Sequence, residues 1–417
     1  MKTIKIRAEK IQSRIDQLAK FSDEPDCISR IFGTKAFIEC RDTIELWMKE
    51  AGLQTYIDNM GNVRGKLLSE KPDAKLFVIA SHFDTVIDAG KYDGILGIVA
   101  GLDILEKLLT DKTNIPFDIE LIAFGDEEGV RFHSAFLGSK TVAGKFETNL
   151  LDKKDDNGIS LESVLQEMKY DPEKLLQDAI PPKKWMGYYE IHIEQGPVLY
   201  KSNIAVGIVT GISGQKRVNI EFTGVSGHAG TVPMNMRKDA LGAAAEFVLA
   251  VEKLAASKKS NIVATVGKLD IQHSASNVIP SKVSCTLDFR SANKKKLSKA
   301  YEDLNELCEE ICNNRKVYFE WNLVQETNPV TCDERLSKLL KKSIKEAKME
   351  VKEIESGAGH DAAVIASVAP VAMLFVKCFK GISHSPLEKV DIKDMAAALE
   401  ISDNFMQQLI ESSKNTD

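Results

Sequence analysis

The sequence lacks the features that mark membrane, secreted and nucleic-acid-binding proteins. Its strongest apolar stretch covers only 362–376 and contains Pro370, whereas a membrane-spanning helix needs about 20 apolar residues. The N-terminal run 1–17 carries charges throughout and has no apolar core of a signal peptide. The 55 basic residues are outnumbered by 61 acidic ones, for a net charge of −6, which opposes binding to phosphate backbones. We therefore expect a cytoplasmic protein without a membrane or nucleic-acid partner.

Cysteine is present, but without the spacings that carry chemistry. The seven cysteines are scattered and include no C-x-x-C pair, which favours a reducing compartment over a disulfide framework. Cys308 and Cys312 stand four apart in a helical pattern, which predicts two thiols on a core face rather than a metal site. The sequence also has no G-x-S-x-G elbow, no P-loop and no G-x-G-x-x-G after a strand. A serine nucleophile and a nucleotide cofactor are therefore poor hypotheses.

The length and the order of apolar patterns predict the fold class. A chain of 417 residues exceeds the ~250–300 residues at which one core stops growing, so two domains are expected. Short apolar runs typical of buried strands alternate with helical patterns, for example at 97–109. This alternation predicts an α/β fold with a mixed, mostly parallel sheet flanked by helices. The strand-like runs are 76–80, 119–124, 188–191 and 371–376, and the first helices are predicted at 5–20 and 35–52.

A different pattern interrupts the chain near residue 213. From 213 to 328 the order strand, helix, strand, strand, helix, strand suggests an inserted ferredoxin-like α+β domain. We therefore predict a catalytic domain formed by 1–212 and 329–417, with 213–328 inserted into it. The stretch 149–184 is polar and rich in lysine and aspartate, and we expect a surface excursion there with one or two helices.

Polar side chains follow several of the predicted strands. His82 and His192 each come directly after an apolar run, and Asp84 stands two residues beyond His82. This spacing lets a carboxylate reach the far nitrogen of the imidazole and fix its tautomer. Because ligands of open α/β sheets bind at the carboxyl ends of the strands, we expect these side chains to meet there.

Carboxylates at the same edge complete a candidate dinuclear metal site. Asp93 alone would be interpreted as a helix N-cap, and Glu127-Glu128 alone as a solvated acidic turn. Together with the histidines they suit Zn²⁺, Mn²⁺, Co²⁺ or Ni²⁺. Adjacent residues of an extended chain point to opposite sides, so one glutamate can bind a metal while its neighbour faces the reacting water. Two such ions can hold a hydroxide and polarise a carbonyl group, which makes hydrolysis the preferred hypothesis.

Eight polar motifs occur in a fixed order along the chain: SHFDT (81–85), KYDG (91–94), GDEEG (125–129), HIEQG (192–196), GHAGTVP (227–233), SNVIP (276–280), SGAGHD (356–361) and GISHSP (381–386). With these motifs the chain resembles a known family, the M20 metallopeptidase-type amidohydrolases, over nearly its whole length. It is most similar to the branch of N-carbamoyl-L-amino acid hydrolases and allantoate amidohydrolases, for which HIEQG and GAGHD are specific.

The resemblance implies a role for each residue of the predicted metal site. Asp93 would bridge two divalent ions, and Glu127 would be the general base that takes a proton from water and delivers it to the leaving nitrogen. Asp84 would orient His82. The implied metal ligands are His82, Asp93, Glu128, His192 and His384. The pair His360-Asp361 would line the site without binding metal.

The resemblance also implies how a small substrate is held. In the family the inserted domain forms a homodimer and closes over the site, so His228 would reach across from the partner subunit to stabilise the oxyanion. Arg290 ends an apolar strand pattern, where its guanidinium could grip a carboxylate bidentately; a surface salt bridge is the alternative. Asn277 could equally be a turn residue. The implied substrate-binding residues are Gln195, His228, Asn277, Arg290, Ala358 and Gly359.

The predicted function is hydrolysis of the ureido C–N bond of an N-carbamoyl-L-amino acid, giving the amino acid, ammonia and carbon dioxide. Allantoate amidohydrolase is the alternative. An M20 dipeptidase is a third option, and Gln195 and Arg290 weaken it because they suit a small acidic substrate. A non-catalytic member of the fold would have lost Glu127 or a ligand, and each of these positions holds the expected residue.

Overall fold

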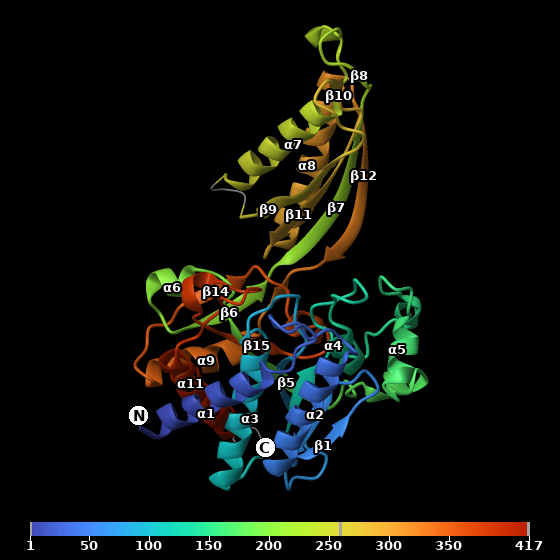
Figure 1. Cartoon of the computed structure of the whole chain (residues 1–417). Helices are drawn as coiled ribbons and strands as arrows, with labels where there is room; N and C mark the ends of the chain where they lie inside the picture. Colours follow the sequence, from blue (N-terminus) through green and yellow to red (C-terminus); the bar gives the residue numbers. More distant parts are fainter. Residues whose placement is uncertain (1, 258–260, 415–417) are drawn as a thin grey trace. The chain divides into compact units, whose positions relative to one another are not determined.

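The computed structural model describes residues 2–257 and 261–414, which form two compact units (Figure 1). The large unit comprises Met1–Thr210, Cys332–Ile354 and His360–Asp417, and the small unit comprises Gly211–Thr331 and Glu355–Gly359. Residues 355–359 group with the small unit because the Ser213 N–H donates to Ser356 O (2.8 Å) and Arg290 donates to Gly357 O (2.8 Å). Dimerisation and lid closure by the small unit stay predictions.

A mixed sheet flanked by helices forms the large unit, which confirms the predicted α/β architecture. In spatial order its strands are β1 (Gln54–Ile57), β2 (Val63–Leu67), β4 (Asp118–Phe124), β3 (Leu76–His82), β5 (Trp185–Ile193), β15 (Val371–Val376) and β6 (Val206–Ile212), with β14 (Glu353–Ser356) beside β6. The sheet ends in β13 (Val330–Thr331), which pairs with Gly211 and Ile212 at the end of β6; these four residues group with the small unit. The central strands β4, β3, β5 and β15 run parallel, whereas the pairs toward both edges are antiparallel. Strands β3 and β15 are buried along their whole length, which explains their continuous apolar runs.

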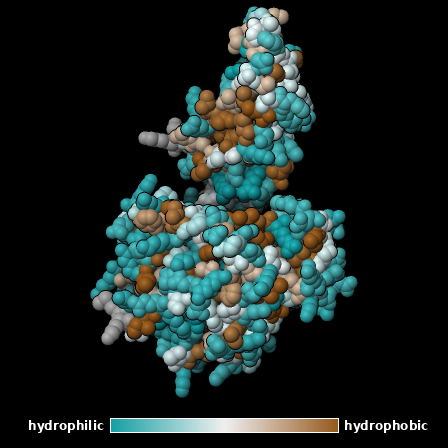
Figure 2. Space-filling view, viewed as in Figure 1, coloured by the Kyte–Doolittle hydropathy of each residue, from teal (hydrophilic) through white to brown (hydrophobic). Residues whose placement is uncertain are grey.

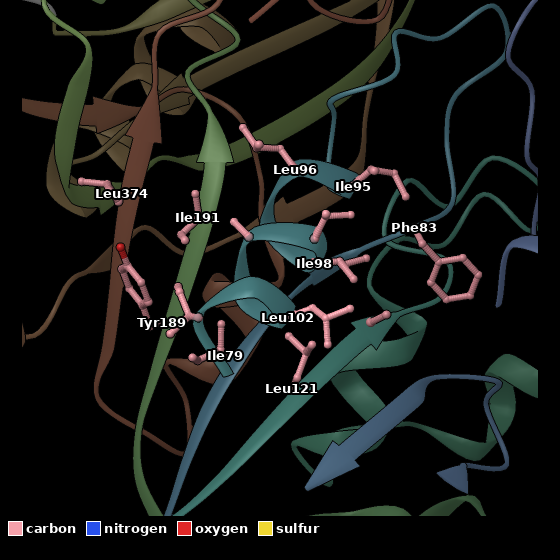
Figure 3. Close-up of a cluster of buried hydrophobic side chains, with 14 of the residues drawn as sticks. Ile79, Phe83, Ile95, Leu96, Ile98, Leu102, Leu121, Tyr189, Ile191 and Leu374 are labelled. Atoms are coloured by element: carbon pink, nitrogen blue, oxygen red, sulfur yellow. The ribbon is translucent and has the colours of Figure 1, made fainter. Parts of the chain in front are cut away.

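Helices pack against this sheet and form its core. Helix α3 (Ile95–Thr110) lies on β3 and β5, and α2 (Lys35–Glu50) lies on β1 and β2. In Figure 3, Ile98 and Leu102 of α3 lie close to Ile79, Leu121 and Ile191 of the strands. The other helical elements are α1 (Lys2–Leu18), α4 (Leu137–Val142), α6 (Val198–Ser202), α9 (Glu334–Glu346), α10 (Asp361–Ile365), η4 (Phe379–Gly381) and α11 (Ile392–Lys414).

The small unit has the predicted order strand, helix, strand, strand, helix, strand. Its antiparallel sheet runs β12 (Tyr318–Thr327), β7 (Gly214–Thr223), β11 (Lys282–Ser291) and β9 (Val263–Ile271), and α7 (Ala240–Ala255) and α8 (Lys294–Arg315) pack on it. Burial alternates along β7 and β11, as expected for a sheet with one covered face. Cys308 and Cys312 of α8 are buried in this core, which confirms the prediction for the pair. The short elements are β8 (Gly227–His228), η3 (Met234–Met236), β10 (Val278–Ile279) and β13 (Val330–Thr331).

The polar stretch 149–184 forms part of the large unit, as predicted. It contains η1 (Thr148–Asp152), α5 (Leu161–Glu167) and η2 (Pro172–Asp178). Among the helices of the described chain, none combines the length and the apolar composition that crossing a bilayer demands. Figure 2 shows hydrophilic residues spread over the large unit and apolar residues gathered around α7 of the small unit. Leu249 of α7 and Val263 of β9 are 65% and 70% exposed.

Candidate metal centre

The predicted ligands meet at the carboxyl edge of the parallel strands, where β3 ends in His82 and β5 carries His192 next to its last residue. Glu127 and Glu128 follow the end of β4, and His384 lies in the loop between β15 and α11. Asp93 precedes the first turn of α3. Helix α3 approaches this edge closely because Gly97 has no side chain: a Cβ there would lie 2.2 Å from Ile191 O.

Asp93 lies at the centre of the cluster and is only 4% exposed. Its Oδ1 is 3.2 Å from His192 Nε2 and 3.8 Å from His82 Nε2. Its Oδ2 is 3.2 Å from His384 Nε2, which is itself 3.6 Å from Glu128 Oε1. The two oxygens of one carboxylate therefore face two different sets of ligand atoms, His82 with His192 and Glu128 with His384.

The tautomers of the two buried histidines suit metal binding. His82 Nδ1 is 3.1 Å from Asp84 O, and His192 Nδ1 is 3.0 Å from Ile193 O. Because a carbonyl oxygen only accepts, each Nδ1 carries a proton, and Nε2 is the atom left to bind a metal. The two Nε2 atoms lie 3.4 Å apart beside the Asp93 carboxylate. Two imidazole nitrogens and a carboxylate that converge in a buried site form a donor set that fits a divalent metal ion.

The pKa values of these groups show how strongly the site favours positive charge. Burial alone would lower the pKa of His192, but its hydrogen bond with Asp93 and the charge of that carboxylate raise it. Burial would raise the pKa of Asp93, yet His192 and His384 hold it well below its usual range. Burial raises the pKa of Glu128 to about 7, and the charge of Asp93 adds to the rise. A bound cation would stabilise these carboxylates in their charged form.

Glu127 and Glu128 lie in a turn rather than in extended chain. Asp126 has φ 58° and Gly129 has φ 64°, and carboxylate oxygens of both glutamates lie within 4.8 Å of each other and of His82. The premise that Glu127 and Glu128 lie in extended chain is therefore wrong, and the division of roles between the two glutamates stays a prediction. Glu127 is 7% exposed, and burial raises the pKa of its carboxyl well above the usual value, as suits a proton acceptor beside a metal site.

Asp84 holds this turn in place. Its Oδ1 accepts the N–H of Glu127 (3.0 Å) and its Oδ2 accepts the N–H of Glu128 (3.1 Å). The Asp84 carboxylate is 3.7 Å from His82 Nδ1, beyond hydrogen-bond length, whereas the Asp84 carbonyl oxygen is closer. In this geometry the backbone of Asp84 orients His82 and its side chain positions the two glutamates.

Gln195 lies among the predicted ligands. Its Nε2 is 3.1 Å from both carboxylate oxygens of Asp93 and 3.4 Å from His384 Nε2. The residue has φ 55°, a left-handed conformation that directs its side chain from the end of β5 toward the cluster. A substrate atom bound near these ligands would therefore lie within hydrogen-bonding reach of the Gln195 amide. This position suits the substrate-binding role predicted for Gln195, which stays a prediction.

The remaining predicted substrate residues belong to the small unit and divide into two groups. His228 and Asn277 are exposed where β8 pairs with β10, and Asn277 O accepts the N–H of Ala229 (2.9 Å). Arg290 lies at the other end of β11, eight residues beyond Lys282, which amounts to roughly 27 Å at about 3.4 Å per residue. His228 and Arg290 of one chain are therefore too far apart to hold the same small molecule.

Arg290 is already paired within the small unit. Its guanidinium donates to both oxygens of Asp288 (3.0 and 3.2 Å) and to Gly357 O (2.8 Å). The backbone of Ala358 is held by Ser356 Oγ, which accepts the Ala358 N–H (3.2 Å), and Gly359 follows in the same exposed loop. The alternative of a salt bridge is thus realised for Arg290, although the guanidinium retains donors for a further acceptor.

Three further polar residues surround the cluster and were not predicted. Ser383 Oγ lies 3.3 Å from Asp93 Oδ2, Glu388 accepts the backbone N–H of Asp93, and Glu190 lies two residues before His192. His360, which was predicted to line the site, packs edge-on against the His192 ring at 4.5 Å between centroids. Strand alternation could have indicated Glu190, because residues two apart in β5 share a face.

Comparisons with known proteins agree with this geometry. The model of Peptidase family M20/M25/M40 matches residues 78–408. The chain is 39% identical to an allantoate deiminase of Arabidopsis thaliana, over 93% of this chain and 79% of the relative. It is 36% identical to an N-carbamoyl-L-amino-acid amidohydrolase of a Pseudomonas strain, over 96% and 98%. The crystal structure of a hydantoinase/carbamoylase family amidase from Burkholderia multivorans superimposes with a TM-score of 0.88 at 30% identity, covering 96% and 97% of the two chains. The chain belongs to peptidase family M20/M25/M40.

Proposed function

We propose that the protein is a metal-dependent amidohydrolase that cleaves the ureido C–N bond of an N-carbamoyl-L-amino acid. The observation that carries the proposal is the position of Asp93, whose two oxygens face two separate sets of ligand atoms. His82 and His192 would hold one divalent ion, Glu128 and His384 would hold the other, and Asp93 would bridge them. Relatives named N-carbamoyl-L-amino-acid amidohydrolase and allantoate deiminase support the reaction class.

The residues around the ligands can perform the proton transfers of such a hydrolysis. Bound divalent ions would supply Lewis acidity and lower the pKa of a coordinated water. Glu127 would accept a proton from that water and deliver it to the nitrogen that leaves. Its burial and the hydrogen bond of its N–H to Asp84 hold the carboxylate in one place. Gln195 would orient the ureido group, and Arg290 would bind the substrate carboxylate with the help of the Ala358-Gly359 backbone.

We further propose that the working form is a homodimer in a reducing compartment such as the cytoplasm. The separation of His228 from Arg290 along β11 supports a site that takes His228, and with it Asn277, from a second copy of the chain. The exposed apolar residues Leu249 and Val263 suit a protein interface. All seven cysteines are free. Sedimentation that gave a fully active monomer near 46.1 kDa would contradict the dimer and the role of His228 in it.

Hydrolysis of allantoate is the second candidate, and the 39% identity to an allantoate deiminase favours it. The two substrates share a ureido group and a carboxylate, so every residue role above serves both.

The test measures ammonia release from the two ureido substrates and, in parallel, the release of free amino acid from a dipeptide. Apoprotein prepared with a chelator is reloaded with Mn²⁺ and given N-carbamoyl-L-methionine, allantoate or a dipeptide. Preference for the carbamoyl amino acid supports the proposal, and preference for allantoate selects the second candidate. A preference for the dipeptide, or inactivity on all three with metal bound, would refute both. The apoprotein and the Glu127→Gln variant are the controls, and both should be inactive.

A further inference from the structure

The Glu388 carboxylate connects two parts of the metal centre that are far apart in sequence. Glu388 lies in the loop between β15 and α11 and is 4% exposed. Its Oε1 accepts the N–H of Tyr92 (2.7 Å) and the N–H of Asp93 (3.1 Å). Its Oε2 accepts the hydroxyl of Ser383 (3.0 Å). One buried side chain thus touches both the segment that carries Asp93 and the segment that carries His384.

The two backbone donors need such a partner. Tyr92 and Asp93 stand just before the N-cap of α3, Gly94, and both residues are buried. A buried backbone N–H group that finds no acceptor costs about as much free energy as a lost hydrogen bond, and Glu388 supplies the acceptor for both. Gly90 lets Glu388 come this close, because a Cβ on Gly90 would lie 2.3 Å from Glu388 Oε1.

The other oxygen of Glu388 fixes the loop that presents His384. Ser383 Oγ lies between Glu388 Oε2 and Asp93 Oδ2, at 3.0 and 3.3 Å, so its hydroxyl can donate to either carboxylate and Glu388 is the nearer acceptor. His384 follows directly and places Nε2 3.2 Å from the same Asp93 Oδ2. The loop is closed at its base by the Phe379 N–H, which donates to Lys389 O (2.7 Å). The position of His384 relative to Asp93 therefore depends on Glu388.

We propose that Glu388 is a positioning residue of the metal centre, which sets the distance between Asp93 and His384 and so preorganises the second ion site. Glu388 belongs to none of the possible ligand groups found among the described residues, and its two oxygens accept hydrogen bonds from Tyr92, Asp93 and Ser383. The inference rests on the proposed function only in taking Asp93 and His384 as metal ligands. Side chains that orient ligands in this way typically change metal affinity about 10–100-fold when they are removed.

The test measures Mn²⁺ binding to the apoprotein by electron paramagnetic resonance of the free ion, with no substrate present. Glu388→Ala should lower the affinity for the more weakly bound of the two Mn²⁺ ions by about 10–100-fold. Glu388→Gln should stay within a few-fold of the wild type, since its amide oxygen accepts the Tyr92 and Asp93 N–H groups and its amide nitrogen donates to Ser383. The matched control is Asp239→Ala, which removes an acceptor of two backbone N–H groups at the start of α7 and should leave Mn²⁺ affinity unchanged.

The Mn²⁺ affinities of the variants either support or overturn the proposed role of Glu388. Wild-type affinity in Glu388→Ala, or a loss in Glu388→Gln as large as that in Glu388→Ala, overturns the proposal. An equal loss in Asp239→Ala also overturns it, because the effect would then follow general stability. If Glu388→Ala does not fold, Glu388→Asp replaces it and should show the same loss, since the shorter side chain cannot span both segments. A wild type that binds Mn²⁺ but hydrolyses no ureido substrate refutes the proposed function and leaves the role of Glu388 to be judged on affinity alone.

Discussion

The candidate ligands of the large unit and the predicted substrate residues of the small unit are held in different ways. Asp93, His82 and His192 are buried at strand or helix ends, and backbone hydrogen bonds fix the two imidazole rings. His228 and Asn277 are exposed beyond the end of their sheet. The comparison teaches that most of the proposed groups for a resident cation are built into one core, with His384 exposed, whereas His228 and Asn277, proposed for a molecule that enters and leaves, lie at a surface.

The largest expected effect is on kcat and comes from a buried residue of the large unit. Glu127→Gln should lower kcat by about 10²–10⁴-fold, because the amide cannot accept the proton of the attacking water. Mn²⁺ affinity should stay at the wild-type level, since Glu127 is not among the proposed ligands. The neighbouring Glu128→Gln variant is the matched control and should lose Mn²⁺ affinity instead. Equal metal loss in both variants would show that the two glutamates share one role.

The second largest expected effect is on KM and comes from a predicted substrate residue of the small unit. Arg290→Ala should raise KM for the carbamoyl amino acid by about 10–100-fold with a smaller change in kcat, because a charge-assisted hydrogen bond contributes about 1.5–3 kcal/mol. Arg217→Ala is the control, as Arg217 also donates to Asp288 (2.9 Å) but is not predicted to touch substrate. A KM that is unchanged in Arg290→Ala would assign the carboxylate to another residue.

The third largest expected effect is a loss of stability caused by overpacking. Gly90→Ala should reduce the free energy of unfolding by about 1–3 kcal/mol, because the added methyl group overlaps Glu388. The Gly90→Ala/Glu388→Ala double variant should recover part of that loss, since the truncated side chain leaves room for the methyl group. Denaturant unfolding of the two single variants and the double variant gives the coupling between the sites. Strict additivity would mean that Gly90 and Glu388 do not constrain each other.

The smallest effect should stay within the small unit. Asp239 accepts the N–H groups of Leu241 and Gly242 at the start of α7, so Asp239→Ala should cost about 1 kcal/mol. Hydrogen exchange should accelerate at the amides of α7 and remain unchanged at those of α3. Acceleration in α3 would show that the two units unfold together.

Much of the centre could be predicted because its residues follow recognisable strands. His82, Glu128 and His192 stand at or just after apolar runs, and the carboxyl ends of parallel strands meet at one edge. The conformation of Glu127 and Glu128 could not be predicted by alternation, because alternation applies to extended chain and the two residues lie in a turn. The family resemblance, rather than periodicity, indicated His384, whose loop has no regular pattern.

Glu388 could not be predicted for a physical reason. Its partners are backbone N–H groups, which every non-proline residue carries, and the Asp93 donor lies 295 residues away. No spacing in the sequence records such a bond. The conformation that brings the donor and the acceptor together exists only once β15 and β3 belong to one sheet.

The position of β15 has a consequence for how the chain is made. This strand lies between β5 and β6, yet it leaves the ribosome after both of them and after the whole of 211–331. During synthesis the small unit can complete its own sheet while the large sheet still has an open edge at β5, of the kind that invites wrong pairing. His384 emerges later still, so the nascent chain can assemble both sets of proposed metal ligands only after β15 and the loop that follows it have been translated.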